Sequence, residues 1–392
     1  MAATEENPQR FEAWLSGIKN DALGKGIAPS TISRAFAGVV PIERVIELDR
    51  RQPEFTQTFG RYFRGVVSAD RVRSGRAAFR SNRKLLSALE ADYGVPARFL
   101  VAFWGLETNY GQFLGYFPVI GALSTLAFDG RRSEFFRSEL FDALLILDHG
   151  HTTPQNMKGS WAGAIGQTQF MPSTFLKHAV DRTGDGHIDV WGSAADALAS
   201  GANYLRNLGW NRSYTWGREV LLPRKFDARL ASVDTSARDV VKSLSDWSAL
   251  GLKTAAKAPL PNVNIEAALV LPAGISGPAF LVYDNYRVIL KWNRATFYAL
   301  AIGHLADRIA GGPALVTPLP DEPPLSRDEV IALQSGLSQL GFLRGEIDGV
   351  IGSESRAAVR AYQIESALPA DGYANRALLD RVKRSAGAAE PT

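Results

Sequence analysis

The chain has 392 residues, of which 46% are hydrophobic and 21% charged, with a net charge of +4, so it can form two or three globular domains. It has no cysteine, which excludes disulfides, thiolate catalysis and cysteine-based zinc sites. Its apolar runs fall short of the roughly 20 residues of a membrane helix, and its Lys and Arg form no long block, so we expect no transmembrane span and no nucleic-acid partner.

The N-terminal stretch MAATEENPQRF lacks the cationic and then apolar segments of a secretory signal. Two interpretations remain open from the sequence alone. Either the chain is cytoplasmic, or it is the mature form of an exported protein with a new Met1. An acylated anchor removed with the true N-terminus is compatible with the second interpretation.

From about residue 10 to residue 210 the pattern is typical of helices, because apolar residues recur at spacings of three and four. Pro96 suits the first position of one helix, and Ser193 suits the cap of another. The expected helices are RFEAWLSGIKNDALGKG, SNRKLLSALEADYG, PARFLVAFWGLETNYG, SEFFRSELFDALLILDHG and SAADALASGANYLRNLGW.

The second part of the chain reads differently. Between about residues 216 and 290, the runs REVLLP, NIEAALVLP, AFLVYD and YRVILKW are short, β-branched and separated by Pro and Gly, which predicts a small sheet. Helical spacing returns in RATFYALAIGHLADRIA. Five prolines then indicate a semi-rigid linker at residues 313–325. Residues 326–385, after this linker, are predicted to form a separate helical module. We therefore expect a mainly α protein.

One carboxylate, Glu107, stands at the end of an almost wholly apolar segment, in WGLETNYG. Burial disfavours the ionised form, so we expect a raised pKa; a carboxyl that stays protonated near neutral pH can act as a general acid. Asn109 and Tyr110 beside it could hydrogen-bond a polar ligand. The alternative is a helix-end glutamate that reaches solvent, and the local sequence does not decide between them.

A stretch rich in small residues, GSWAGAIGQTQFMPSTF, covers residues 159–175. Its glycines permit close backbone approach and sharp bends. Ser160, Gln167 and Gln169 supply neutral hydrogen-bonding groups among aromatic residues, an arrangement that suits a sugar. The alternative is a tight packing seam between helices.

DRTGDGHID, residues 181–189, matches the first part of an EF-hand loop, with oxygen-bearing side chains at positions one, three, five and nine and glycine at six. The twelfth position is Gly192 and not the usual bidentate glutamate. Asp196 could close the site from farther along. The predicted calcium ligands are Asp181, Thr183, Asp185, the His187 carbonyl and Asp196, and an empty turn is the alternative.

The commonest catalytic motifs are absent. The sequence has no HExxH, no GxSxG elbow and no phosphate-binding loop. His149 and His151 are separated by one residue, which is not the spacing of zinc ligands on a helix. The commonest hydrolase, kinase and dehydrogenase interpretations are therefore excluded.

Six stretches together resemble the lytic murein transglycosylase B family, with its membrane-bound and soluble forms. The resemblance covers residues 8–312, in order and at similar intervals. It implies a lysozyme-like helical catalytic domain with a small β subdomain, which cleaves the MurNAc–GlcNAc β-1,4 bond of peptidoglycan without water and leaves a 1,6-anhydro-MurNAc end. The stretches are WGLETNYG, GALSTLAFD, FFRSEL, GSWAGAIGQTQFMPSTF, DRTGDGHIDVW and ILKWNRATFYALAI.

The resemblance also implies roles for individual residues. Glu107 matches the single catalytic acid/base. Positions that bind glycan or lie near the scissile bond correspond to Ser160, Gln169, Tyr204, Asn293 and Tyr298. The family's calcium loop falls on the EF-hand-like ligands named above, which implies a structural Ca²⁺ and no cofactor for the chemistry.

The chain departs from the family pattern in three places. Trp292 stands where the family often has Tyr, and Ile165 where it often has Met; both keep the apolar character. One extra residue separates Trp191 from Asp196. This insertion puts Asp196 in doubt as the fifth calcium ligand.

LQSGLSQLGFLRGEIDGVIGSESRAAVRAYQIESALPADG resembles the peptidoglycan-binding domain of cell-wall enzymes, with Ser355 in place of Thr and Tyr362 in place of Phe. The resemblance implies a small three-helix domain that tethers the catalytic domain to the wall and raises the local substrate concentration. A spacer that has lost binding is the alternative.

The sequence thus predicts a monomeric lytic transglycosylase whose partner is the peptidoglycan glycan strand. A periplasmic location follows from the substrate and not from a visible signal. A lysozyme-type hydrolase is the first rival; it needs a second carboxylate, which the matched motifs do not provide. The second rival is a non-catalytic wall-binding protein, which would bind the wall without cleaving it.

Overall fold

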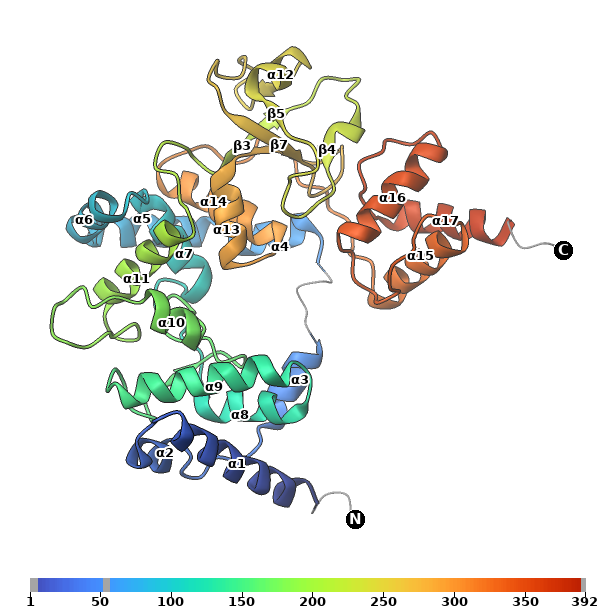
Figure 1. The fold of residues 1–392 in the computed structure, drawn as a ribbon. Helices are drawn as coiled ribbons and strands as arrows, with labels where there is room; N and C mark the ends of the chain where they lie inside the picture. Colours follow the sequence, from blue (N-terminus) through green and yellow to red (C-terminus); the bar gives the residue numbers. More distant parts are fainter. Residues whose placement is uncertain (1–5, 52–56, 389–392) are drawn as a thin grey trace. The chain divides into compact units, whose positions relative to one another are not determined.

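The computed structural model describes residues 6–51 and 57–388 (Figure 1). The chain folds into two compact units: unit 1 contains residues 1–52 and 74–207, and unit 2 contains residues 53–73 and 208–392. The chain leaves unit 1 for the last time after residue 207, close to residue 210, where the predicted helical region ends. None of the helices in the described ranges is both long and apolar enough to cross a membrane.

Unit 1 is built almost wholly from helices, as the apolar spacing predicts. Its one small ribbon pairs β1 with β2 in antiparallel fashion. Ser193 caps α11, because its Oγ accepts the N–H of Asp196 at 3.1 Å. The elements of unit 1 are α1 (Glu6–Gly24), α2 (Pro29–Ala35), α3 (Glu43–Arg51), α5 (Ala69–Ser81, which begins in unit 2), α6 (Arg83–Tyr93), α7 (Ala97–Thr108), β1 (Phe117–Pro118), α8 (Val119–Asp129), α9 (Ser133–Asp148), β2 (Lys158–Gly159), α10 (Pro172–His178) and α11 (Ala194–Asn207).

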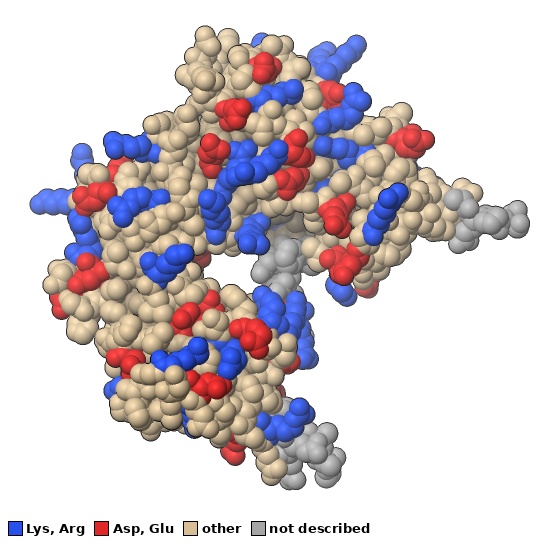
Figure 2. Space-filling model, in the orientation of Figure 1, with Lys and Arg blue, Asp and Glu red and all other residues tan. Residues whose placement is uncertain are grey.

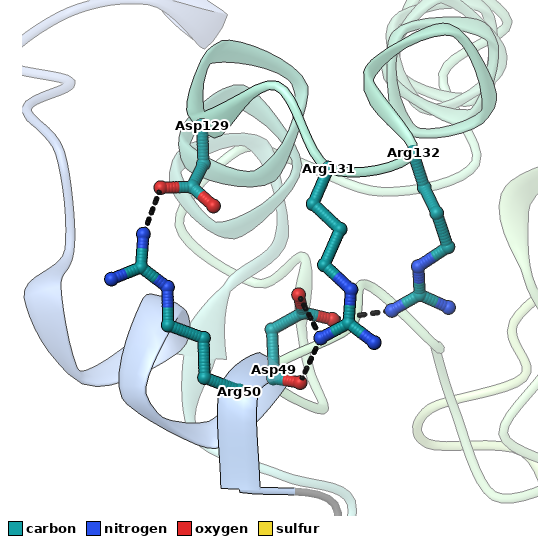
Figure 3. Close-up of polar contacts among 5 residues, drawn as sticks. All are labelled: Asp49, Arg50, Asp129, Arg131 and Arg132. Atoms are coloured by element: carbon teal, nitrogen blue, oxygen red, sulfur yellow. Dashed lines mark hydrogen bonds and ion pairs between the residues drawn. The ribbon is translucent and has the colours of Figure 1, made fainter. Parts of the chain in front are cut away.

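A buried carboxylate ties α3 to the turn between α8 and α9 (Figure 3). Asp49 is 1% exposed and accepts hydrogen bonds from Arg131, at 3.3 Å, and from Arg132. Arg131 also donates to the Asp49 backbone carbonyl at 2.8 Å, and Arg50 pairs with Asp129 at 3.0 Å. Removing one partner of a buried ion pair leaves an uncompensated charge. The cluster therefore fixes the end of α3 against the two helices.

The β-rich part of unit 2 is a sheet with the strand order β4-β7-β8-β3-β6, to which β5 adds by pairing with β7. The pairs are antiparallel except β4 with β7. Trp247 and Leu281 are buried in its core, and the Trp247 indole N–H donates to the Ala267 carbonyl at 2.9 Å. The elements are β3 (Gly217–Leu221), a 3₁₀ turn (Ala228–Leu230), β4 (Ala231–Ser232), β5 (Lys242–Ser243), α12 (Leu244–Ala249), β6 (Lys253–Thr254), β7 (Glu266–Val270) and β8 (Ala279–Val282).

One predicted strand is wrong. YRVILKW lies in helix α13 (Asp284–Trp292) and not in the sheet. All residues from Asn285 to Leu290 are buried, among them the charged Arg287, so burial over this run follows neither a helical nor an alternating pattern. A short buried helix and a buried strand have the same apolar pattern, and the β-branched residues do not separate them.

Helix α14 (Thr296–Ile309) packs on α4 (Phe59–Val66) around a buried imidazole. His304 is 8% exposed, and its ring centre lies 5.2 Å from that of Phe63. Burial lowers its pKa from 6.5 to about 4. The folded protein therefore keeps this imidazole neutral under conditions in which the unfolded chain protonates it.

We expect the free energy of unfolding to fall as the pH drops from about 6.5 towards 4. In this range the unfolded state binds the His304 proton and the native state does not, so stability rises with pH by up to about 3 kcal/mol. Denaturant titrations of wild type and His304→Leu at several pH values measure this contribution as a difference. The exposed residue His149, replaced by Gln, is the control; equal pH slopes for all three proteins would contradict the assignment.

The C-terminal module has three helices, α15 (Arg327–Gln339), α16 (Ser353–Glu365) and α17 (Arg376–Ala388), as predicted. Two buried glutamines each hold an Asp-Gly turn. The Gln334 amide donates to Asp348 at 2.9 Å and accepts the next N–H at 2.8 Å. Gln363 makes the same two bonds to Asp371 and Gly372, each at 2.8 Å. These bonds explain why the motif repeats Gln and Asp-Gly.

The proline-rich segment before this module is bonded to the rest of unit 2. Glu219 of β3 accepts the N–H groups of Val316 and Thr317 at 2.9 and 2.8 Å. Arg64 of α4 pairs with Asp321 at 2.9 Å. From the module, Tyr373 donates to Glu322 at 2.5 Å.

The module also contacts the sheet directly. Asp371 accepts the N–H of Ile275 at 2.9 Å, and Ser353 accepts that of Thr235 at 3.3 Å. Gly274 has a φ of +70°, and a Cβ there would lie 2.9 Å from Asp371. Within unit 2, the module is thus held against loops of the β-rich part as well as being joined to it by the proline-rich segment.

Surface charges are interspersed. On the face drawn in Figure 2, Lys and Arg lie among Asp and Glu. Exposed pairs such as Arg44–Glu47, at 2.6 Å, join neighbouring positions of one helix. Such pairs contribute little to stability, and the mixture gives that face no extended block of one sign.

Candidate active site

Helix α7 ends immediately after the predicted catalytic glutamate. Glu107 is half-buried in the last turn of a helix whose other residues are mostly buried. The chain then takes three successive left-handed conformations, with φ values of 50° at Asn109, 63° at Tyr110 and 81° at Gly111. Such conformations stop a helix and cost energy for residues other than glycine. They hold Glu107 at an abrupt helix end.

The side chain of Gln167 joins this helix end to the glycine-rich stretch. It is 5% exposed; its oxygen accepts the Trp104 indole N–H at 2.9 Å, and its amide nitrogen donates to the Trp191 carbonyl at 3.1 Å. Thr108 donates to the Gln167 backbone carbonyl at 2.9 Å and accepts the N–H of Gly111 at 3.1 Å. The sequence suggests that Gln167 faces a sugar, whereas the structure uses it to position the neighbours of Glu107.

The glycine-rich stretch forms tight loops and not a helical seam. The Ser160 N–H donates to the Ala164 carbonyl at 2.8 Å, and the Ser160 hydroxyl accepts the Ala164 N–H at 3.0 Å. A Cβ on Gly159 would lie 2.1 Å from the Ala164 carbonyl oxygen, and one on Gly115 would lie 2.0 Å from that of Gly159. Both positions require glycine, because backbone atoms cannot give way.

Gln169 and Tyr204 lie around the end of this stretch. The Gln169 amide donates to the carbonyls of Leu114 and Gly166 at 3.1 and 2.9 Å. Tyr204 of α11 is half-buried and packs edge-to-face on Phe170, with ring centres 5.3 Å apart; burial raises its pKa. These bonds place Ser160 and Gln169 in loops that contact residues 114–115, just after the end of α7 where Glu107 lies.

The last two predicted glycan residues belong to unit 2. Asn293 ends α13, is exposed, and accepts the N–H of Ala295 at 3.1 Å through its side chain. Tyr298 is 6% exposed in α14. Their part in the reaction stays a prediction.

Unit 1 contains another shielded carboxylate, Glu139 of α9. It is 4% exposed, and burial raises its pKa. One oxygen accepts the Ser173 N–H at 2.9 Å and the other accepts the Ser173 hydroxyl at 2.7 Å. Both oxygens therefore serve the first turn of α10, so this carboxylate has a structural function.

The loop that the sequence predicts to be EF-hand-like folds around the carboxylate of its first residue. Asp181 accepts the N–H groups of Gly184 at 2.6 Å and Gly186 at 2.8 Å, and these bonds lower its pKa. Both glycines have positive φ. Together with Thr183, Asp185 and the His187 carbonyl, it offers the hard oxygen atoms that calcium prefers.

Asp196 shapes this loop from within. It is 1% exposed; one oxygen accepts the N–H groups of Arg182 and Thr183 at 2.9 and 3.2 Å, and the other accepts that of Asp189 at 3.0 Å. Among the residues that the structure describes, no group of three or more His, Asp or Glu side chains gathers around one point. Asp196 as the fifth ligand stays a prediction.

This fold and this site belong to a known class of enzyme. Residues 10–307 match the transglycosylase SLT domain, and residues 326–382 match a putative peptidoglycan binding domain. The chain therefore belongs to the transglycosylase SLT-domain family, whose lysozyme-like members act on peptidoglycan. The family, the lytic transglycosylase activity and the C-terminal domain predicted from the sequence are confirmed.

The chain is also similar to individual lytic transglycosylases of this family. The chain is 33% identical to membrane-bound lytic murein transglycosylase B of Escherichia coli (strain K12) over 256 residues, which are 64% of this chain and 67% of that protein. It also resembles SltB3 from Pseudomonas aeruginosa, solved in complex with NAG-anhNAM-pentapeptide, with a TM-score of 0.91 and 46% identity over 95% of this chain and 99% of that one. Slt35 of Escherichia coli, solved in complex with calcium, has a TM-score of 0.65 and 29% identity over 78% and 93% of the two chains.

Proposed function

We propose that Glu107 is the single acid/base of a non-hydrolytic cleavage of the MurNAc–GlcNAc β-1,4 bond. The observation that carries this proposal is its position: half-buried at the end of an apolar helix, next to a helix stop that Thr108 and Gln167 hold in place. The proposal requires this carboxyl to be protonated when the glycan strand binds, because a general acid must have a proton to give.

The reaction balances without water. Glu107 gives its proton to the glycosidic oxygen, the C1–O bond of MurNAc breaks, and the GlcNAc side leaves as an alcohol. The MurNAc N-acetyl group stabilises the developing positive charge, as in substrate-assisted glycosidases. The C6 hydroxyl of the same sugar then attacks C1, and ionised Glu107 takes its proton. Intramolecular attack has a high effective molarity, which lets it outrun water.

Digestion of purified sacculi tests this reaction. Product masses are expected to be one water lighter at the new MurNAc end than those of a hydrolase. A lysozyme-type hydrolase needs a second carboxylate to activate water, and the shielded carboxylate of Glu139 already serves Ser173. Products of hydrolytic mass would overturn the mechanism, and sacculi bound without cleavage would favour a wall-binding protein.

The glycan strand is proposed to contact neutral groups around Glu107. Ser160 and Gln169 lie on the tight loops beside α7, and Tyr204 supplies a half-buried ring. Neutral donors and aromatic faces suit sugar hydroxyls and sugar rings. Asn293 and Tyr298, which belong to unit 2, are proposed as glycan-contacting residues from the family resemblance alone.

A structural calcium ion is proposed for the EF-hand-like loop. The support is the hard-oxygen donor set of Asp181, Thr183, Asp185 and the His187 carbonyl, with the positive-φ glycines of the loop. The ion would stiffen this loop and take no part in the chemistry. Asp196 is proposed as the additional ligand.

Calcium is expected to raise the melting temperature, because an ion that binds only the folded state stabilises it by about 3 kcal/mol at a hundredfold excess over Kd. Thermal unfolding with calcium and with a chelator measures this shift. Asp181→Asn should abolish it, whereas Asp227→Asn, which alters an exposed carboxylate paired with Arg229, should keep it. Identical melting curves for wild type in both conditions would contradict the proposal.

The enzyme is proposed to work as a monomer in the periplasm, where its substrate lies. Its C-terminal module is proposed to bind peptidoglycan while seated on the sheet of unit 2. The contacts of Asp371 and Glu219 with neighbouring backbone support this arrangement.

A further inference from the structure

Helix α10 ends in a buried histidine, His178, that the proposed chemistry does not use. It is 9% exposed, and its ring lies against that of Tyr204, with the ring centres 4.7 Å apart. Phe170, just before α10, packs edge-to-face on the same tyrosine, and Thr174 in the first turn of α10 hydrogen-bonds the tyrosine hydroxyl. One short stretch of chain, residues 170–178, therefore makes three contacts with the Tyr204 side chain.

Helix α11, which carries Tyr204, fixes the position of His178. The Asn203 side-chain amide donates to the His178 backbone carbonyl at 2.8 Å, and the Asn207 amide, one turn farther along, donates to Nδ1 of the imidazole at 3.1 Å. Because Nδ1 accepts this bond, the ring proton is on Nε2. Burial and the neighbouring Lys177 lower the pKa of His178, which keeps the ring neutral and able to accept. The orientation of the imidazole is therefore set by the helix whose tyrosine it contacts.

Tyr204 is half-buried, and the proposed function gives its ring a contact with the glycan strand. An aromatic ring binds a sugar best when its plane is already set, because a side chain that is immobilised only on binding loses rotamer freedom. The His178 imidazole restricts the Tyr204 ring before any sugar arrives. We propose, on the basis of the proposed function, that His178 is a positioning residue that holds the Tyr204 ring in the orientation that contacts the glycan.

The test measures kcat and KM from the release of anhydro-muropeptides from soluble peptidoglycan strands, well below the melting transition of each variant. His178→Leu is expected to raise KM about fivefold and to change kcat by less than about twofold, because a loosened tyrosine weakens binding equally in the ground and transition states. His178→Phe keeps a flat ring against Tyr204 and should restore KM to within about twofold of the wild-type value. The double variant His178→Leu, Tyr204→Leu should have the KM of Tyr204→Leu alone, since the two residues act as one unit.

The matched control is Phe136→Leu on α9, which removes another buried ring of unit 1, one that packs on Phe135. It should leave KM unchanged. An equal rise of KM in this control, or additive effects in the double variant, would overturn the proposal, because His178 would then contribute only ordinary packing. If wild type forms no anhydro product, the proposed function fails; if it does and His178→Leu keeps the wild-type KM, the positioning proposal alone fails.

Discussion

Glu107→Gln is expected to lower the turnover of peptidoglycan about a thousandfold and to leave binding of glycan strands nearly unchanged. Glutamine keeps the size and polarity of the side chain but can neither give a proton to the leaving oxygen nor take one from the C6 hydroxyl. Release of anhydro-muropeptides, followed by mass spectrometry, measures the first effect. Co-sedimentation with sacculi measures the second.

Glu139→Gln is the matched control, because it changes another glutamate of unit 1, one that is buried, in the same way. Its expected effect is a loss of about 1–2 kcal/mol of stability from the weakened bonds to the Ser173 N–H and hydroxyl, with turnover retained below the melting transition. Full turnover by Glu107→Gln would remove the assignment. Loss of the chemistry in a folded Glu139→Gln would transfer it to the second carboxylate and favour the hydrolase.

The helices of unit 1 were predictable because their apolar residues repeat at helical spacing and their ends carry chemical signals. Ser193 caps α11 through its hydroxyl, as its position indicates. The strand prediction for YRVILKW was wrong because the run is short and is buried as far as Leu290, and a short buried run is compatible with either a strand or a helix.

The site divides along a similar line. An isolated acid at an apolar helix end could be found in the sequence, because ionised groups are costly to bury and therefore stand out. Gln167 was also noticed, but the sequence left open whether it binds a sugar or packs inside the protein. A buried amide and a sugar-binding amide have the same sequence context. The two functions are distinguished only by the partners of the side chain, which are the Trp104 indole and the Trp191 carbonyl. Both partners are distant from Gln167 in the sequence.

The loop that is proposed to bind calcium illustrates a third case. Its spacing identified Asp181 and the two glycines, which depend on neighbours within six residues. Asp196 lies farther along the chain, and its carboxylate accepts backbone N–H groups that no local pattern specifies. Sequence spacing therefore predicts the contacts of residues that lie close together in the chain. It does not predict contacts that depend on the path of a long loop.

Gln167→Leu is expected to reduce stability by about 2–4 kcal/mol and kcat by at least tenfold. Leucine fills a similar volume but cannot form hydrogen bonds. The substitution therefore removes the bonds that the Gln167 side chain makes with the Trp104 indole N–H and the Trp191 carbonyl. The Thr108 bond to the residue 167 carbonyl does not need the side chain, so the fold should survive. Denaturant titration gives the stability change, and anhydro-muropeptide release at low temperature gives kcat.

Gln112→Leu is the control for this substitution, because Gln112 is exposed on the same loop and bonds only the Asn109 side chain among the contacts described, at 2.8 Å. It should change stability by less than about 0.5 kcal/mol. A fall in kcat with KM unchanged in Gln167→Leu, measured well below the melting transition, would show that the glutamine positions the end of α7 for proton transfer. A stability loss with normal kcat would instead make Gln167 a packing residue, and the alignment of Glu107 would then rest on the left-handed turn at Asn109 and Tyr110.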